Sequence, residues 1–252
     1  MTAAGRMHDG DPPWLWQMRD RDGRRLRAAR ILAVLEDFSG VPLAGATLLD
    51  VGASHGLIAA ALAERVAWTL GIDVDAAALC AALGERPTCG QLDLVRGSGT
   101  RLPFRDECMD FVVCNHVYEH VPDAPALLRE VARVLRPGGT CYFAGGHRLQ
   151  LIEPHYRLPF LSWLPRPWAD RYVRASGRGR DYGERFVAPW NLPALFAGFG
   201  SARNVTGDAL RQCHRYGLGP RWLQAVFAVL LPMPLARAVG FALPTHLWIL
   251  RK

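Results

Sequence analysis

A glycine-containing turn, followed by an acidic residue 21 positions after its first glycine, points most directly to chemistry. The turn runs from Asp50 to Gly56 (DVGASHG), its first glycine is Gly52, and the acid is Asp73. Glycine lets a backbone approach a ligand closely, and a helix that begins at the turn offers unpaired N–H groups. A carboxylate at the end of the next strand can accept hydrogen bonds from ribose hydroxyls. Together these features predict a site for an adenosine-containing ligand.

The segments around these residues alternate between strand and helix patterns. Apolar runs predict strands over 47–51, 67–73, 91–95, 109–115 and 139–145, and amphipathic or alanine-rich runs predict helices over 19–38, 57–66, 76–83 and 124–135. Residues 147–189 show little periodicity, and element signals resume over 191–199, 202–205 and 245–250. Strands that alternate with helices at this spacing form βαβ units. The pattern therefore predicts an α/β fold with a largely parallel sheet.

The turn departs from the dinucleotide pattern G-x-G-x-x-G, because Ser54 and Leu57 occupy the second and third glycine positions. The chain instead resembles the class I S-adenosylmethionine-dependent methyltransferases from about residue 47 to 145, most closely those that act on small molecules, quinones and lipids. The resemblance rests on LLDVGASHG (48–56), GIDVD (71–75), GSGTRLPFRDECMDFVVCNHVYEHV (97–121) and LLREVARVLRPGG (127–139). It implies a doubly wound, Rossmann-like, seven-stranded, mostly parallel sheet with the last strand antiparallel, and S-adenosylmethionine as cofactor.

The resemblance also implies which residues bind the cofactor. Those at its methionine end are Gly52, Ala53, Ser54 and Gly56, with Asp50 near the amino group; Asp73 binds the ribose; Val74, Ser98 and Gly99 surround the adenine; Asn115 and His116 close the site through their backbone. Two positions depart from the family pattern. Ser54 replaces the middle glycine, and Ser98 replaces an aspartate that contacts the adenine amino group. A neutral, shorter partner at Ser98 would weaken binding by about 1 kcal/mol.

Histidines supply the candidates for a catalytic base. Methyl transfer from a sulfonium is an in-line displacement, and a hydroxyl acceptor would benefit from a base that removes its proton. We rank His120 first, then His155, then His116. The histidines and carboxylates over 106–123 lack the spacing of metal ligands, so we expect no metal. For any single one of these histidines, a structural role is the favoured alternative.

The acceptor is less defined than the cofactor. Residues 147–190 combine aromatic and arginine side chains, which suits a flat, apolar or anionic ligand and predicts an acceptor pocket. The segment after the fourth strand, Asn115-His116-Val117-Tyr118, lacks the prolines of enzymes that methylate base amines, so nucleic acid is disfavoured. We expect O-methylation of a small molecule, glycolipid or secondary metabolite. The alternatives are a non-catalytic or membrane-associated binding module on the same fold, and an RNA methyltransferase.

Charge divides the chain into an acidic and a basic part. The net charge is +7, yet residues 31–145 hold 8 arginines and 14 acids, whereas residues 146–252 hold 15 basic residues and 5 acids. An apolar segment over 221–243 is flanked by arginines, which favours an anionic membrane surface or, alternatively, packing on the sheet or a partner. We divide the chain into an N-terminal helical cap (1–40), a cofactor-binding core (41–146), an insertion (147–190) and the remainder of the sheet (191–252).

The remaining composition points to the cytoplasm. Met1 to Leu15 contains acids and prolines in place of the apolar core of a secretory signal, and no uncharged run is long enough for a spanning helix. The six cysteines form no Cys-x-x-Cys pair and are typical of reduced thiols. We therefore expect a cytoplasmic protein, peripheral to the inner membrane face if the segment over 221–243 binds lipid. The oligomeric state cannot be predicted from the sequence.

Overall fold

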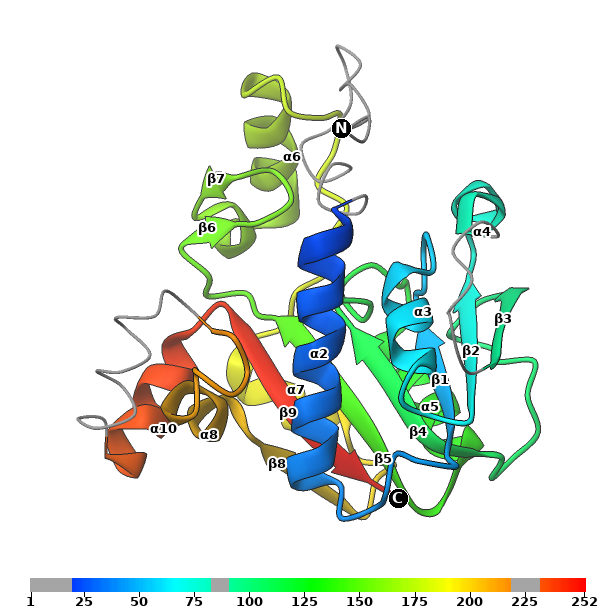
Figure 1. The fold of residues 1–252 in the computed structure, drawn as a ribbon. Helices are drawn as coiled ribbons and strands as arrows, with labels where there is room; N and C mark the ends of the chain where they lie inside the picture. The colour runs from blue at the N-terminus through cyan, green and yellow to red at the C-terminus, as the bar shows by residue number, and fades with distance from the viewer. Residues whose placement is uncertain (1–19, 83–90, 219–231) are drawn as a thin grey trace, which may run out of the picture.

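The computed structural model describes residues 20–82, 91–218 and 232–252 and contains a seven-stranded sheet with the order β3-β2-β1-β4-β5-β9-β8 (Figure 1). The strands are β1 (Thr47–Val51), β2 (Trp68–Asp73), β3 (Gln91–Arg96), β4 (Met109–Asn115), β5 (Leu135–Gly146), β8 (Ser201–Asn204) and β9 (Thr245–Arg251). Neighbours from β3 to β5 pair in parallel, and β9 is antiparallel to both β5 and β8. The doubly wound, mostly parallel sheet with an antiparallel last strand is thus confirmed.

Helices cover both faces of this sheet. They are α2 (Arg21–Phe38), α3 (Leu57–Ala63), α4 (Ala76–Ala82), α5 (Ala124–Val134), α7 (Leu192–Leu195), α8 (Thr206–Arg211) and α10 (Met233–Ala242). In β4, Phe111 and Val113 belong to the core under α2, whereas Val112 and Cys114 belong to the core under α5. Figure 1 shows α2 in front of the sheet and α5 behind it. Burial on both faces explains why this strand is an uninterrupted apolar run.

The order of the strands places a ligand site at the ends of β1 and β4. The chain proceeds from β1 outward to β2 and β3, and then returns to β4 on the other side of β1. The loops that follow β1 and β4 therefore diverge at the carboxyl edge of the sheet. Ligands bind at this switch point in doubly wound folds.

Three element boundaries differ from the predicted ones by three or four residues, and the others differ by no more than two. Helix α3 ends at Ala63 instead of Val66, because Val66 enters the core from the turn that follows the helix. Strand β5 begins at Leu135 instead of Gly139, since Leu135 already pairs with Met109 before a register shift. Helix α7 spans only Leu192–Leu195 of the predicted 191–199. The hydrophobic periodicity of a sequence does not distinguish an apolar residue in a turn from one in a helix. It also does not reveal a residue that pairs before a β-bulge.

The insertion contains regular elements that periodicity did not indicate. They are the hairpin of β6 (Ile152–Glu153) and β7 (Leu158–Pro159), the short helix η1 (Leu161–Trp163) and helix α6 (Arg166–Ala175). Helix α6 buries only Ala169 and Val173, one turn apart, so its apolar stripe is too narrow to recognise. Figure 1 shows the hairpin and α6 beyond the sheet, at the end where the parallel strands finish. The insertion therefore lies on the side of the predicted site.

Two predicted segments lie partly outside the described residues. Of the N-terminal cap, α2 is described from Arg21, and residues 1–19 are outside. Of the apolar segment over 221–243, residues 221–231 are outside, and α10 begins at Met233. Among the described helices, none combines the length and the apolar character needed to cross a bilayer.

Candidate functional site

The turn after β1 adopts the strained backbone that its glycines suggest. Gly52 and Gly56 have φ angles of 75° and 68°, and Ser54, at the position of the missing glycine, has a φ angle of 49°. A Cβ atom at Gly52 would lie 2.7 Å from Cγ2 of Val117, so the loop after β4 packs directly on this turn. Left-handed backbone is uncommon for serine. Its N–H donates to Oδ2 of Asp73 at 2.7 Å, which holds the turn in place.

Asp73 lies at the end of β2, where the ribose-binding carboxylate was predicted. Its second oxygen, Oδ1, accepts the N–H of Asp75 at 2.9 Å. A carboxylate has about four lone-pair positions, so two backbone donors leave capacity for two hydroxyls. Val74, predicted to pack on the adenine, is 63% exposed. An exposed apolar side chain beside the carboxylate suits a flat ring that would cover it.

Ser98 and Gly99 lie in the loop after β3, as expected, but the hydroxyl of Ser98 already has a partner. It is 2.8 Å from Oγ1 of Thr100 and also accepts the Thr100 N–H. A Cβ atom at Gly99 would lie 2.8 Å from Leu127 and 2.9 Å from Val51. The site therefore has no room for a side chain at Gly99, and a hydrogen bond from Ser98 to a ligand would compete with Thr100.

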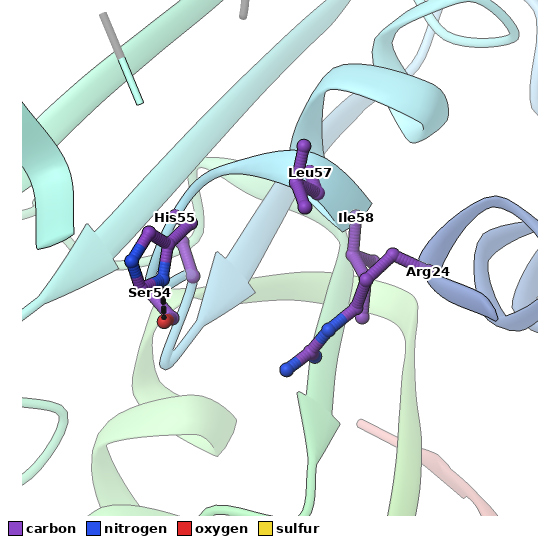
Figure 2. A pocket seen from close by; sticks show the side chains of 6 residues that line it. Arg24, Ser54, His55, Leu57 and Ile58 are labelled. Carbon is purple, nitrogen blue, oxygen red and sulfur yellow. Dashed lines mark hydrogen bonds between the residues drawn. The ribbon is translucent and has the colours of Figure 1, made fainter. Parts of the chain in front are cut away.

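Asp50 and Arg24 place opposite charges beside the turn. Burial raises the pKa of Asp50 from 3.8 to about 7; the charge of Arg24 opposes this shift and that of Asp73 reinforces it. Arg24 projects from α2 into a shallow surface depression that it shares with the turn and the first residues of α3 (Figure 2). Its buried Nε has no hydrogen-bond partner. An unpaired guanidinium N–H beside this turn suits the carboxylate of an amino-acid group.

Sequence reasoning missed Arg24. Its position on the polar face of α2 resembles that of the other arginines of the helix. Only the packing of α2 against α3 brings it to the turn, 26 positions before Asp50. No spacing rule in the sequence indicates this contact.

The loop after β4 carries a histidine–carboxylate pair. Nδ1 of His116 is 3.0 Å from Oε1 of Glu119, which is fully buried. Burial would raise the pKa of Glu119, but the hydrogen bond to His116 and the nearby histidine charges lower it below its usual value. His116 has a φ angle of 56°, and its N–H donates to the carbonyl of Ala144. A non-glycine residue held in this conformation is typical of functional sites.

The insertion supplies a second histidine–carboxylate pair. Nδ1 of His155 is 2.6 Å from Oε1 of the fully buried Glu153, and the other oxygen of Glu153 accepts the N–H of Tyr156. Burial would lower the pKa of His155, but the hydrogen bond and charge of Glu153 raise it. The pairing fixes the ring and leaves its Nε2 as the second functional atom.

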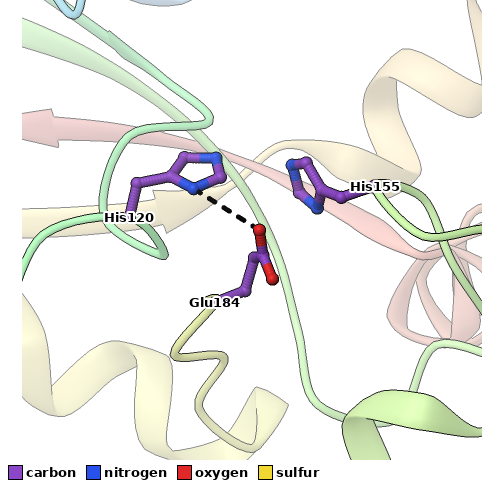
Figure 3. A group of neighbouring side chains, drawn as sticks. All are labelled: His120, His155 and Glu184. Atoms are coloured by element: carbon purple, nitrogen blue, oxygen red, sulfur yellow. Dashed lines mark ion pairs between the residues drawn. The ribbon is translucent and has the colours of Figure 1, made fainter. Parts of the chain in front are cut away.

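His120 and His155 lie together at the junction of the two segments (Figure 3). Their rings are 4.8 Å apart and nearly perpendicular, and Nδ1 of His120 is 4.0 Å from Oε1 of Glu184. Burial lowers the pKa of His120, although the charge of Glu119 opposes the shift, and burial raises the pKa of Glu184. The Arg185 N–H donates to the Glu119 carbonyl, which joins the insertion to the loop after β4. The structure thus brings His120 and His155 into contact, and His116 belongs to the adjacent pair.

The side chains of His120, His155 and Glu184 were not predicted to meet. Their ligand atoms all lie within 4.8 Å of one another, which makes them the cluster most suited to a metal ion among the described residues. Ligands of a tetrahedral zinc are about 3.3 Å apart, given metal–nitrogen bonds of about 2.0–2.1 Å. The side chains would have to approach one another before they could share an ion. Glu119, Glu153 and Glu184 were not among the predicted site residues. Glu119 and Glu153 pair with histidines three and two positions away, so short spacing could have indicated them, whereas Glu184 meets His120 only through the fold.

Comparisons with known proteins agree with this architecture. Residues 49–143 match the family described as "Methyltransferase domain". The chain is 32% identical over 216 residues to an uncharacterized methyltransferase of Mycolicibacterium paratuberculosis, an alignment that covers 80% of this chain and 78% of that protein. It is 37% identical over 154 residues to an uncharacterized methyltransferase of Mycobacterium sp. strain JLS. That alignment covers 57% of this chain and 57% of the relative.

A solved structure shows the same fold. The S-adenosylmethionine-dependent methyltransferase of Mesorhizobium loti superposes with a TM-score of 0.59 at 17% identity, covering 90% of this chain and all of that one. The sequence similarity extends over most of the length of the Mycolicibacterium relative, and the fold is shared with a solved structure. The chain belongs to the class I S-adenosylmethionine-dependent methyltransferase family.

Proposed function

We propose that this methyltransferase moves a methyl group from S-adenosylmethionine to a hydroxyl oxygen of a small-molecule, glycolipid or secondary-metabolite acceptor. The observation that carries the proposal is the contact between His120 and His155 where the insertion meets the loop after β4. That loop packs on the glycine turn through Val117. A proton acceptor thus lies beside the expected cofactor site, on the side where an acceptor would enter.

The residues at the carboxyl edge fit the cofactor. Asp73 has free acceptor capacity for the ribose hydroxyls, and the glycines of the turn carry no side chain that would hold a ligand away from the backbone. Asp50 and Arg24 match the ammonium and the carboxylate of the methionine part. When bound, S-adenosylmethionine supplies a methyl group already activated on a positive sulfur. The chain therefore needs to align the acceptor and to remove its proton.

His120 is the best placed of the three candidate bases. Because burial lowers its pKa, His120 is neutral at neutral pH and can accept a proton. Glu184 and Glu119 would then stabilise the imidazolium that forms. His155, oriented by Glu153, would hold the acceptor oxygen, and His116 with Glu119 would shape the floor of the site. A hydroxyl nucleophile benefits most from this arrangement, since it must lose a proton as the new bond forms.

Variants of the histidines test the assignment. We expect His120→Ala to lower kcat about 100-fold or more, the contribution typical of a general base. His214→Ala, at an exposed site on another part of the chain, is the control and should leave turnover unchanged. The assay supplies methyl-labelled S-adenosylmethionine with a panel of hydroxylated small molecules and glycolipids, and mass spectrometry locates the methyl group.

The outcomes separate the parts of the proposal. Transfer to nitrogen or carbon would contradict O-methylation, and label in RNA would favour the RNA methyltransferase alternative. Cofactor binding, measured by calorimetry, without transfer to any acceptor would favour a binding module. If His120→Ala and His155→Ala both retain full turnover, neither histidine is the base.

A further inference from the structure

The insertion exposes a group of large apolar side chains on its hairpin and on the two short helices, η1 and α6, that follow it. We call the set formed by Leu151, Ile152, Phe160, Trp163 and Trp168 the hairpin face. Each of the five is between 43% and 67% exposed. The Phe160 N–H donates to the Leu151 carbonyl, and the rings of Phe160 and Trp163 lie 5.3 Å apart. Phe160 thereby joins Leu151 and Trp163 into one surface rather than isolated exposed residues.

These side chains are not needed by the insertion's own core. That core contains Leu158, Leu161, Ala169, Val173 and Tyr182. Within the hairpin, Glu153 pairs with Leu158 on the buried side, and Ile152 pairs with Pro159 on the exposed side. The alternation leaves Ile152 outside a core that is already complete. An apolar surface that the fold does not use is typical of an interaction site.

The insertion also carries more positive charge than its acids can match. Residues 147–190 hold eight arginines and four acids. Arg148 donates to the carbonyls of Ser162 and Trp163, and Arg178 donates to those of Tyr156 and Arg157. Within the described parts of the chain, no carboxylate lies within 4.0 Å of the guanidinium of Arg148, Arg157 or Arg178. Their charges remain available to an anionic partner.

The backbone at both ends of β7 is strained. Arg157, before the strand, and Phe160, after it, have φ angles of 53° and 55°. Left-handed backbone is unfavourable for a residue as large as phenylalanine. The fold nevertheless retains it at a residue whose side chain is half exposed. Such outliers are most often kept where the exposed group has a role.

We propose that the hairpin face docks on the surface of an anionic lipid bilayer. The aromatic and aliphatic side chains would enter the interfacial layer, and the arginines would lie at the lipid phosphates. The hairpin carries His155 and Glu153 as well, so docking would place the proposed acceptor site next to the bilayer. A second copy of the chain fits less well, because two such faces would bring like charges together. The inference does not depend on which atom is methylated.

Vesicle co-sedimentation tests the proposal with the full chain. Phosphatidylcholine vesicles are compared with and without phosphatidylglycerol. We expect binding to the anionic vesicles, with the double variant Leu151→Ser/Ile152→Ser reducing the partition coefficient about tenfold or more. Arg157→Gln should weaken binding to the anionic vesicles alone. The matched control is Leu235→Ser on α10, a leucine that is 50% exposed within the apolar segment over 221–243.

Each further result decides for or against the hairpin face. Unchanged binding by the double variant overturns the proposal, and loss of binding only in Leu235→Ser assigns the membrane contact to α10 instead. A dimer in light scattering that the double variant dissociates, without vesicle binding by the wild type, assigns the face to a second copy. Circular dichroism and cofactor calorimetry of the double variant establish that it is folded. Because vesicle binding is measured without turnover, failure here leaves the methyl-transfer proposal intact.

Discussion

At the scale of single residues, Asp50 links stability to cofactor binding. Its carboxyl is 3% exposed, and burial raises its pKa to about 7. In the unfolded chain the same group ionises near 3.8. As pH rises from the lower value through the higher one, the unfolded state loses a proton that the folded state keeps. The free energy of unfolding therefore decreases over this range, and Asp50 destabilises the ligand-free protein at pH 8.

Replacing Asp50 by asparagine should separate the two roles. We expect Asp50→Asn to raise the free energy of unfolding at pH 8 by about 2–4 kcal/mol and to have little effect at about pH 2.5, where the carboxyl is neutral in both states. The same variant should weaken binding of S-adenosylmethionine about tenfold at pH 8, because an ionised carboxylate attracts the cofactor's ammonium. Denaturant titration and calorimetry measure the two effects.

Asp22→Asn provides the comparison, since Asp22 is an exposed acid in the first turn of α2. It should leave cofactor affinity unchanged and lower the free energy of unfolding at pH 8 by no more than about 1 kcal/mol, the usual contribution of an acid in the first turn of a helix. If Asp50→Asn binds the cofactor as tightly as the wild type at pH 8, Asp50 does not contact the ammonium. If its stability follows the same pH dependence as the wild type, the carboxyl is already ionised in the folded state.

At the scale of elements, the sequence pattern predicted those features that depend on residues close together in the chain. Strands β1 and β4 match their predicted bounds, because each is a largely apolar run. Gly52 follows β1 and His116 follows β4, and neither residue belongs to the sheet. The glycine turn and Asp73 could be recognised for the same reason, since turn, strand and acid follow one another in sequence. The contact of His120 with His155 could not, because 35 residues and a change of element separate them. Both histidines could be chosen as candidates from the sequence, but their contact with each other could not be predicted from it.

The insertion packs as a unit separate from the sheet. Its small core is distinct from the two cores of the sheet, and Val173 of α6 is fully buried within it. We expect Val173→Ala to loosen the insertion by about 1–3 kcal/mol without an equal loss of global stability. Hydrogen exchange should then show faster exchange over 151–176 and unchanged exchange in β1 and β4.

Val134→Ala is the matched variant, because Val134 is also fully buried but belongs to the core under α5. It should lower the midpoint of global unfolding and speed exchange throughout the sheet. Equal global effects of the two variants would mean that the insertion and the sheet unfold as one unit. In that case closure of the insertion could not be regulated independently of the fold.

At the scale of the whole molecule, the structure shows where the acidic and the basic parts of the sequence lie. The acidic residues 31–145 contain the cofactor turn and the strands that hold it, and the basic insertion stands beyond the end of those strands (Figure 1). A cationic cofactor and an anionic surface would thus be attracted to different parts of the molecule. Salt provides a way to separate them, because exposed charges are screened more than buried ones.

Raising sodium chloride from about 0.1 M to about 1 M shortens the Debye length from about 10 Å to about 3 Å. We expect this change to reduce association with phosphatidylglycerol vesicles at least about tenfold, since the arginines of the insertion act through exposed charge. Affinity for S-adenosylmethionine should change less than about threefold, because Asp50 and the turn are buried and their contacts short. Co-sedimentation and calorimetry at both salt concentrations measure the two responses. Vesicle binding that resists salt would mean that the apolar side chains alone hold the protein, and equal losses in both assays would mean that the charge division has no functional consequence.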